Sequence, residues 1–472
     1  MKVVVIGSGL AGLECGRLLA QKGLEVVILE QQSNAGGCLQ TFKRKGLSFD
    51  TGFHCVGGMD EGEHLWRLLE RLGLTSLPWR AMDRDSFSQV TIYGRDYVFP
   101  MGHDAYAEQL KHYFPNQKQQ IDQYVSLLKE VGDKIGTDNE IRENNLALSA
   151  YDSLCKLFDD QRLIQVVSGA SMMLDLDPER LPFYSFLQIN DSFLRGAYRL
   201  EGGGDSIVRQ LCSDIEQMGG QIVTSARVDK IYVENKNVVG VEAIMKDGTR
   251  LHIDHPDWVI SDINPTKAFE MMEGANLRPV YCRRIAQMPN SRGIFTANLV
   301  LKKDTLPYQN HNVFIHKNAD IWHNDAKNAE SVMVHYAVPK GDEPTRIDLM
   351  APMEWNLVQA WSGSEQSRDA AYRQLKQHWL EDAVELASTK LPGLPESIDL
   401  AYTSTPLTYY RYNSVAEGAA FGVERDWHKG INSVISPRTP IDNFLLTGQN
   451  LMLHGVLGVT MTAIDTAKHI ME

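Results

Sequence analysis

The sequence has 472 residues, of which 43% are hydrophobic, and a formal net charge of -13. This length exceeds what one hydrophobic core usually serves, so two domains are expected. The negative balance disfavours nucleic-acid binding, which calls for a basic face, and it leaves only apolar docking open as a route to membrane contact. Six cysteines without a CxxC pair indicate reduced thiols and a cytoplasmic setting.

The N-terminal stretch MKVVVIGSGLAGLECG contains a short apolar run, residues 3–6. A secretory signal needs about 7–15 apolar residues in a row, so this run does not predict one. A membrane-spanning helix needs about 18 or more, and no window of the sequence offers them. We therefore expect the first strand of the fold to begin almost at Met1.

A βαβ unit opens the chain. The β-branched run Lys2–Ile6 predicts a buried strand, a leucine face predicts a helix that ends at Gly23, and residues 26–29 predict the next strand. The GxGxxG pattern GSGLAG stands between strand and helix, and Glu30 closes the second strand about 20 residues later. This combination predicts a dinucleotide-binding site.

Each glycine of this loop is required for a physical reason. Gly7 permits a tight turn, Gly9 leaves room for a pyrophosphate at the helix N-terminus, and Gly12 lets helix and strand pack closely. Glu30 would accept hydrogen bonds from a ribose hydroxyl. No second GxGxxG follows a strand, so we interpret the site as an FAD site, with NADPH or NADH as an electron donor that lacks a recognisable motif. The expected contacts here are Gly7, Gly9, Leu10, Ala11, Gly12, Glu30 and Gln31.

Two later segments add further elements. Residues 207–215 predict a helix that Gly219-Gly220 ends, and strands are expected at 221–223, 228–234, 238–245, 250–253 and 259–261. Near the C-terminus, residues 444–447 predict a strand, and a glycine-rich loop leads to a helix from about Gly458. Helices are also expected at 61–74 and 106–135, and the alternation in TYYRY favours a half-buried strand. The histidines show no ligand spacing, so no metal site is expected.

Linked motifs resemble one known superfamily. AGGCLQTFKRKGLSFDTGFHCVGGMDEG, TPLTYYRYNSVAEGAAFGVERD and TPIDNFLLTGQN occur in this order. They resemble the flavin amine oxidase and phytoene desaturase superfamily, which includes carotenoid isomerases, and within it the retinol saturase (all-trans-retinol 13,14-reductase) branch. The resemblance spans nearly the whole chain.

The resemblance implies an α/β fold: a Rossmann-like FAD-binding domain of the GR2 type with an inserted mixed α+β substrate domain. Residues 1–65, 200–265 and 430–472 would form the discontinuous FAD domain. The substrate domain would consist of residues 66–199 and 266–429. Its helical part is considered as a surface that could face a membrane. An apolar lip is expected within 151–198, for which LPFYSFLQINDSFL is the candidate, with an ordinary core helix as the alternative.

The resemblance also implies further cofactor contacts. Glycines would let the backbone approach the middle of FAD, Val228 would present backbone to the adenine, and the last helix would point its N-terminus at the flavin pyrimidine. The residues concerned are Gly36, Gly37, Cys38, Val228, Gly448, Gln449, Gly455, Val456 and Leu457. Lys43, Arg44 and Lys45 are interpreted as a solvated hairpin tip.

The function implied is reduction of a C=C bond in a long apolar conjugated polyene. Such a bond carries no activating carbonyl, so a proton donor has to accompany hydride transfer, in an apolar tunnel. The candidates for the acid are His54, Tyr409, Tyr410, Tyr412 and His454, each with a structural hydrogen bond or core packing as the alternative. Polyene isomerisation or desaturation stays open, and a flavin-free prenyl-binding module is a distant alternative.

Three departures from the branch bear on the substrate. Cys55 stands where the branch has Tyr, and His454 stands where its C-terminal loop has Cys. The N-terminal membrane-targeting segment of the animal members has no counterpart, so the expected location is cytoplasmic, with peripheral membrane contact left open.

Overall fold

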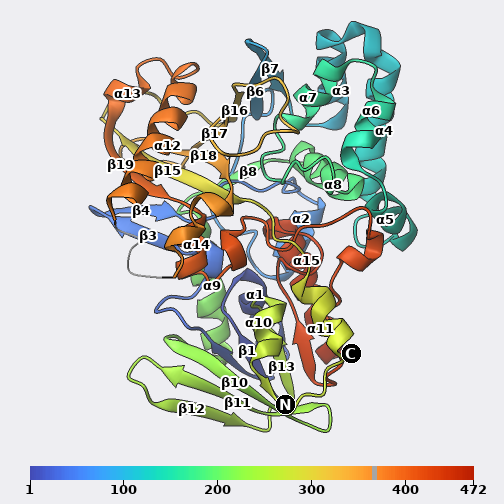
Figure 1. The fold of residues 1–472 in the computed structure, drawn as a ribbon, viewed down its shortest axis with the longest axis vertical. Helices are drawn as coiled ribbons and strands as arrows, with labels where there is room; N and C mark the ends of the chain where they lie inside the picture. Colours follow the sequence, from blue (N-terminus) through green and yellow to red (C-terminus); the bar gives the residue numbers. More distant parts are fainter. Residues whose placement is uncertain (364–368) are drawn as a thin grey trace.

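The computed structural model describes residues 1–363 and 369–472. Figure 1 shows three regions: a lower part built around β1 and β10–β12, a second sheet at the upper left, and a group of helices at the upper right. The lower part contains the parallel sheet, and residues from this part, from the second sheet and from the helices line one cavity.

A five-stranded parallel sheet in the order β20-β13-β1-β2-β9 forms the first core. Its strands come from distant segments and match the strands expected from sequence. Hydrophobic β-branched side chains fill both faces, as a parallel sheet between two layers requires. The strands are β1 (Lys2–Ile6), β2 (Glu25–Leu29), β9 (Gln221–Val223), β13 (Trp258–Ser261) and β20 (Phe444–Leu446).

Three helices cover one face of this sheet. Helix α1 (Leu10–Gln21) packs against both α9 (Gly204–Gln217) and α15 (Gly455–Met471). Close packing uses Gly16, where a Cβ would lie 2.7 Å from the Ile28 side chain. The last helix begins at Gly455 rather than near Gly458, so its N-terminus reaches one turn further toward the cavity.

A four-stranded sheet, β12-β11-β10-β14, covers the other face. Its three long strands are antiparallel and were expected from sequence within two residues at each end. They are β10 (Ala226–Glu234), β11 (Asn237–Met245) and β12 (Arg250–Asp254), with β14 (Met272–Glu273) at the edge and α10 (Pro265–Glu270) and α11 (Pro279–Ala286) beside them.

The second large sheet has seven strands in the order β19-β15-β18-β17-β16-β6-β7. One face packs on α12 (Ala370–Ser388) and buries Trp379, while the other face turns Met333 and Met350 toward the helices and the cavity. The strands are β6 (Ser88–Ile92), β7 (Arg95–Phe99), β15 (Gly293–Leu301), β16 (Asn312–His316), β17 (Ser331–Tyr336), β18 (Arg346–Met353) and β19 (Ile398–Ser404), and α13 (Leu394–Ser397) precedes the last of them.

The helical region shares one core with this sheet. The single helix expected at 106–135 is two helices, because Pro115 cannot continue the first one. The helices are α3 (His103–Tyr113), α4 (Lys118–Asp133), α5 (Asn139–Leu146), α6 (Ala150–Leu157), α7 (Gln161–Ser168) and α8 (Phe183–Leu194). Helix α2 (His64–Arg71) lies near α15 instead.

Helix α8 contains the segment considered as an apolar lip. Its large side chains, including Phe183, Phe186 and Leu187, are buried, so α8 is a core helix and not an exposed lip. Within the described residues, no helix combines the length and apolar character that crossing a bilayer requires.

Two short antiparallel strand pairs complete the fold. The hairpin β3 (Thr41–Arg44) and β4 (Leu47–Asp50) turns at Lys45-Gly46, and its basic tip is exposed as expected; β5 (Trp79–Ala81) pairs with β8 (Tyr198–Leu200) nearby. The prediction of a strand at TYYRY was wrong. This segment is helix α14 (Pro406–Tyr412). Pro406 occupies its first position, where the missing N–H removes no hydrogen bond of the helix.

Candidate functional site

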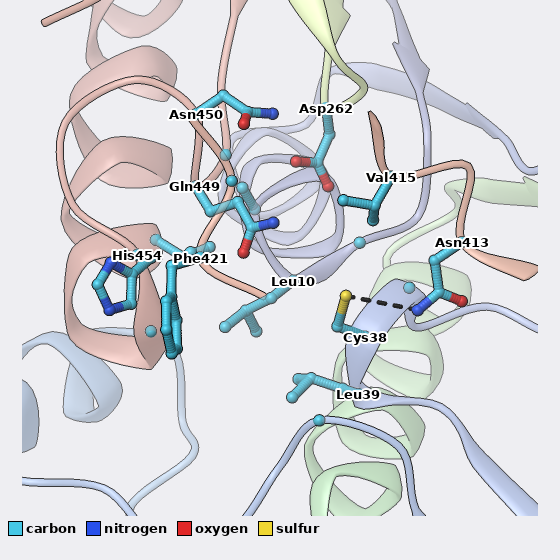
Figure 2. Close-up of a pocket in the computed structure, with 18 of the residues that line it drawn as sticks. Leu10, Cys38, Leu39, Asp262, Asn413, Val415, Phe421, Gln449, Asn450 and His454 are labelled. Atoms are coloured by element: carbon cyan, nitrogen blue, oxygen red, sulfur yellow. Dashed lines mark hydrogen bonds between the residues drawn. The ribbon is translucent and has the colours of Figure 1, made fainter. Parts of the chain in front are cut away.

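A cavity of about 740 Å³ lies outside the carboxyl ends of β1, β2, β13 and β20. Parallel sheets place ligand sites at this edge. The cavity runs from the glycine loop after β1, past the N-terminus of α15, to side chains of the seven-stranded sheet and α8. Its size falls in the ordinary range for cofactor and ligand sites, about 300–1,000 Å³. Figure 2 shows Leu10, Cys38, Asp262 and Gln449 among the residues that line it.

The glycine loop leaves a cradle at the start of α1. A Cβ on Gly9 would lie 2.5 Å from Oδ2 of Asp262, and a Cβ on Gly12 would lie 2.3 Å from the carbonyl oxygen of Gly7. Gly7 has a φ of +97°, which L side chains rarely adopt. Leu10 and Ala11 line the cavity where the N-terminus of α1 faces it, and Gly12 lies just behind them. This geometry suits the pyrophosphate of a dinucleotide.

Glu30 is fixed at the end of β2. Its Oε2 accepts hydrogen bonds from the Ser8 backbone N–H at 3.0 Å and from the Ser8 hydroxyl at 2.6 Å, and its Oε1 accepts one from the N–H of Gln32 at 2.7 Å. Glu30 and Gln31 both line the cavity. Val228 on β10 also lines the cavity, so this end would suit a ribose and its base.

Asp262 also belongs to this end, and the sequence reasoning missed it. It follows β13 directly, and its Oδ2 accepts a hydrogen bond from the N–H of Gly12 at 2.9 Å. A Cβ on Gly448 would lie 2.4 Å from its other oxygen, so the carboxyl group fills the space between two glycine loops. Burial and, to a lesser extent, the charge of Glu30 raise the pKa of Asp262 to about 7, against the opposing effect of the Gly12 hydrogen bond.

We expect Asp262→Asn to remove a pH dependence of FAD binding. The pyrophosphate carries negative charge, so it favours the protonated acid, and binding takes up a proton. When binding raises the pKa of a group, affinity is highest at pH values below the pKa that the group has in the ligand-free protein. Affinity then falls as the pH rises above that pKa. The dissociation constant for FAD of the unaltered chain should therefore grow above pH 7 by up to about tenfold per pH unit. The amide keeps an oxygen for Gly12 and should give a flat profile in fluorescence titrations of apoprotein.

Glu424 supplies the control for this experiment. Burial raises its pKa to about 7 as well, but it pairs with Arg180 at 2.8 Å and is not among the residues that line the cavity. Glu424→Gln should keep the pH slope of the unaltered chain. A flat profile in the unaltered chain, or a slope that survives in Asp262→Asn, would show that Asp262 does not face the pyrophosphate.

The middle of the cavity is formed by the chain after β2. Gly36 and Gly37 have φ values of +121° and +54°, and a Cβ on Gly37 would lie 3.0 Å from the Cα of Gly9. The next residue, Cys38, accepts a hydrogen bond from Nδ2 of Asn413 at 3.5 Å (Figure 2). Burial raises the pKa of the Cys38 thiol, so it remains protonated at neutral pH.

The N-terminus of α15 closes the next part of the cavity. Gln449 lies in the glycine-rich loop after β20, and His454 is the cap residue of the helix. Nε2 of His454 lies 2.7 Å from the carbonyl oxygen of Met173, and its ring lies 4.7 Å from that of Phe421, beside which Figure 2 shows it. Burial lowers the pKa of His454 to about 4, so the imidazole is neutral at pH 7. The predicted contacts Gly448, Gly455, Val456 and Leu457 also line the cavity.

The far end of the cavity is apolar. Its lining includes Met172, Met173, Ile189, Phe193, Met333 and Met350. His54 lies here, and its carbonyl oxygen accepts a hydrogen bond from Nε2 of His335 at 2.9 Å. Burial lowers the pKa of His54 to about 3, so this imidazole is also neutral at pH 7. An apolar wall with uncharged histidines suits a hydrocarbon chain.

The three tyrosines of α14 have different positions. Tyr409 lines the cavity and donates a hydrogen bond to the carbonyl oxygen of Thr51 at 2.7 Å. Tyr410 is not in the lining; its ring packs on Trp355 at 5.1 Å between centroids, so the structure does not support it as a catalytic residue. Tyr412 reaches the cavity wall but is 65% exposed, which places it at the rim, away from a dry reaction centre.

The cavity fits FAD in its donor set and in its shape. Glycine cradles that a Cβ would fill would receive the pyrophosphate, Glu30 would accept hydrogen bonds from the ribose, and the N-terminus of α15 would face the flavin pyrimidine. Residues from the three sequence segments expected to bind FAD meet here, although they lie up to 450 positions apart.

Comparisons with known proteins support an FAD-binding Rossmann-like fold. Residues 10–281 match the family described as flavin containing amine oxidoreductase. The chain is 25% identical to the all-trans-retinol 13,14-reductase of Danio rerio, over 100% of this chain and 86% of the relative. It is 22% identical to the chloroplastic prolycopene isomerase of Daucus carota, over 99% and 79%. Its fold is similar to a solved oxidoreductase from Methanosarcina mazei, with a TM-score of 0.68, 18% identity and coverage of 99% and 100%.

Proposed function

Because the chain belongs to the family of flavin-containing amine oxidoreductases, we propose that it is an FAD-dependent enzyme that reduces a C=C bond of a long apolar conjugated polyene of the retinoid or carotenoid type. One observation carries this proposal: a single cavity joins a dinucleotide cradle to an apolar end lined by methionines and aliphatic side chains. Thioether and aliphatic walls adapt to a long hydrocarbon.

Different residues along the cavity would bind different parts of FAD. FAD supplies the hydride when it is bound and reduced. The glycine loop, Glu30 and Val228 would hold its nucleotide half, and Gly36, Gly37, Gln449 and the N-terminus of α15 would hold its flavin half. NADPH or NADH is the donor we propose for reducing it. The domain division proposed with this function keeps residues 1–65, 200–265 and 430–472 for FAD.

We assign the proton donor to Tyr409. A hydride added to an unactivated C=C leaves a carbanion unless a proton arrives with it. Burial raises the pKa of Tyr409 to about 12, so its phenol carries a proton at every physiological pH. His54 and His454 are neutral because burial lowers the pKa of each, and they remain as alternatives that donate only from neutral imidazole.

Isomerisation is the second candidate, since the carotenoid relative from Daucus carota is a prolycopene isomerase. The same apolar wall and FAD cradle would serve it. Product mass separates the two reactions: reduction adds two hydrogens and isomerisation adds none.

The test is an anaerobic titration. The bound flavin is reduced, then mixed with all-trans-retinol, lycopene or an unsaturated fatty acid, and its reoxidation is followed by absorbance. Reoxidation by a polyene with a product two hydrogens heavier supports the reductase. A protein that binds no FAD after reconstitution would instead favour the prenyl-binding module, and product of unchanged mass would favour the isomerase.

We propose the cytoplasm as the location, supported by six cysteines that are all free, with contact to a membrane surface limited to substrate exchange.

A further inference from the structure

A small chamber adjoins the apolar end of the cavity. Four side chains line both spaces and form their shared wall: Cys55, Met173, Ile189 and Phe193. Beyond them the chamber lies between the seven-stranded sheet and helices α3, α7 and α8, with Phe87, Phe99, Val167 and Phe314 in its lining. The chamber therefore lies directly behind the apolar end of the cavity, across these four side chains.

Ser88 is the unusual residue of this chamber. It lies at the start of β6, is 1% exposed, and its hydroxyl has no hydrogen-bond partner. Side chains alternate along a strand, and Val90, two positions on, belongs to the core shared with the helices, so Ser88 faces the same side. A buried hydroxyl without a partner costs free energy, which a ligand could recover.

A polar group stands next to Ser88. Asn312 is its partner in the register of β6 and β16, and it also lines the chamber. The Asn312 amide donates to Sγ of Cys55 at 3.2 Å, and its oxygen accepts a hydrogen bond from Arg199 at 2.8 Å. One N–H of the amide thus remains for a ligand.

Arg199 gives this corner a positive charge. The side chain is fully buried, and its guanidinium donates to neutral groups: the Tyr308 hydroxyl, the carbonyl oxygens of Gln309 and His311, and Asn312. Among the residues that the structure describes, no hydrogen-bond partner of this guanidinium is a carboxylate, and its Nε has no partner. A buried cation without a counter-charge favours an electron-rich oxygen nearby.

The chamber has a volume of about 40 Å³. One water-sized position takes about 10–15 Å³ by this measure, so the chamber admits about three such positions. That is enough for a hydroxymethyl, aldehyde or carboxylate group and too little for a ring.

We propose that this chamber is the subsite for an oxygen-bearing end of the polyene, whose oxygen accepts hydrogen bonds from Ser88 and Asn312. This rests on the proposed function and sharpens it: the substrate is an oxygen-ended polyene rather than a pure hydrocarbon, and it enters with its polar end leading.

The experiment measures binding to the oxidised flavoprotein, through perturbation of the flavin spectrum, so that turnover is not required. The probes are all-trans-retinol, all-trans-retinoic acid and the hydrocarbon in which a methyl group replaces the hydroxymethyl group of retinol. The oxygen-ended compounds should bind about tenfold tighter than the hydrocarbon, as one or two recovered hydrogen bonds allow. Equal binding of the hydrocarbon would overturn the proposal.

Ser88→Ala should cut this preference by about five- to tenfold and leave hydrocarbon binding unchanged. Because the hydroxyl has no partner in the free protein, the variant should melt no earlier than the unaltered chain. Ser185→Ala is the matched control: Ser185 is also buried with an unpartnered hydroxyl, and it lines neither space. Ser185→Ala should keep the full preference.

Two results would overturn the inference: Ser88→Ala that retains the preference, or Ser88→Ala that melts markedly earlier than Ser185→Ala, which would make Ser88 structural. A different result would contradict the proposed function, namely that no polyene reoxidises the reduced flavin. The binding preference is measured on the oxidised flavoprotein and does not depend on that result.

Discussion

Gly12→Ala should give a protein that holds less than about a tenth of the FAD of the unaltered chain. The new Cβ would lie 2.3 Å from the carbonyl oxygen of Gly7, a separation that real Cβ atoms do not show, and the obstacle is backbone. Helix α1 would have to move away from the end of β1. That movement pulls the helix N-terminus from the cradle and loosens the hydrogen bond between Gly12 and Asp262. Flavin absorbance per protein after purification measures the loss.

Two variants make this result specific. Gly363→Ala adds the same methyl group where no described residue lies within 4 Å, and it should keep its FAD. Gly9→Ala meets the carboxylate end of Asp262, at 2.5 Å, and takes space expected for the pyrophosphate, so it should also lose FAD. Its fold should be disturbed less than that of Gly12→Ala, because the obstacle is a side chain that can rotate. Full FAD content in Gly12→Ala, with an unchanged melting temperature, would contradict the assignment of this loop to the pyrophosphate.

The nucleotide half of the site was predictable because its signals are local. The strand β1, the glycine loop, helix α1 and strand β2 occupy 28 consecutive residues, and each step follows from side-chain size, turn chemistry or periodicity. The fold class and the family could be predicted for the same reason, since linked short motifs survive where overall identity is low.

Asp262 shows what local patterns cannot supply. Its hydrogen bond to Gly12 spans 250 positions, and an acidic residue after a strand is ordinary in any sequence. Only the order of strands, with β13 next to β1, brings it to the glycine loop. The rule that ligands bind beyond the carboxyl ends of parallel strands would have drawn attention to it.

Helix α14 shows a different failure. The alternation of aromatic and polar residues in TYYRY also fits one short amphipathic turn, and five residues are too few to separate the two periods. Pro406 at the first helical position was the signal that could have decided it. The error mattered because a strand would have turned Tyr410 and Tyr412 to one face, whereas the helix turns Tyr409 into the cavity.

Tyr409→Phe should lower the rate at which a polyene reoxidises the reduced flavin by about 10²–10⁴-fold, the usual contribution of a positioned acid. FAD content and substrate binding should stay near those of the unaltered chain, because the ring remains and only the hydroxyl that bonds to Thr51 is lost. Single-turnover reoxidation under anaerobic conditions isolates this step from reduction by an external donor.

The neighbouring residue provides the control. Tyr410→Phe removes the same atom from the same helix, outside the cavity lining, and should change the rate by less than about twofold, as a substitution away from the site does. The pH profile gives a second readout. Because burial raises the pKa of Tyr409 to about 12 and lowers those of His54 and His454 to about 3 and about 4, the rate should be flat from pH 6 to 9. A rate that falls tenfold per unit above pH 7 in this step, or Tyr409→Phe with full activity, would move the proton donor to another residue.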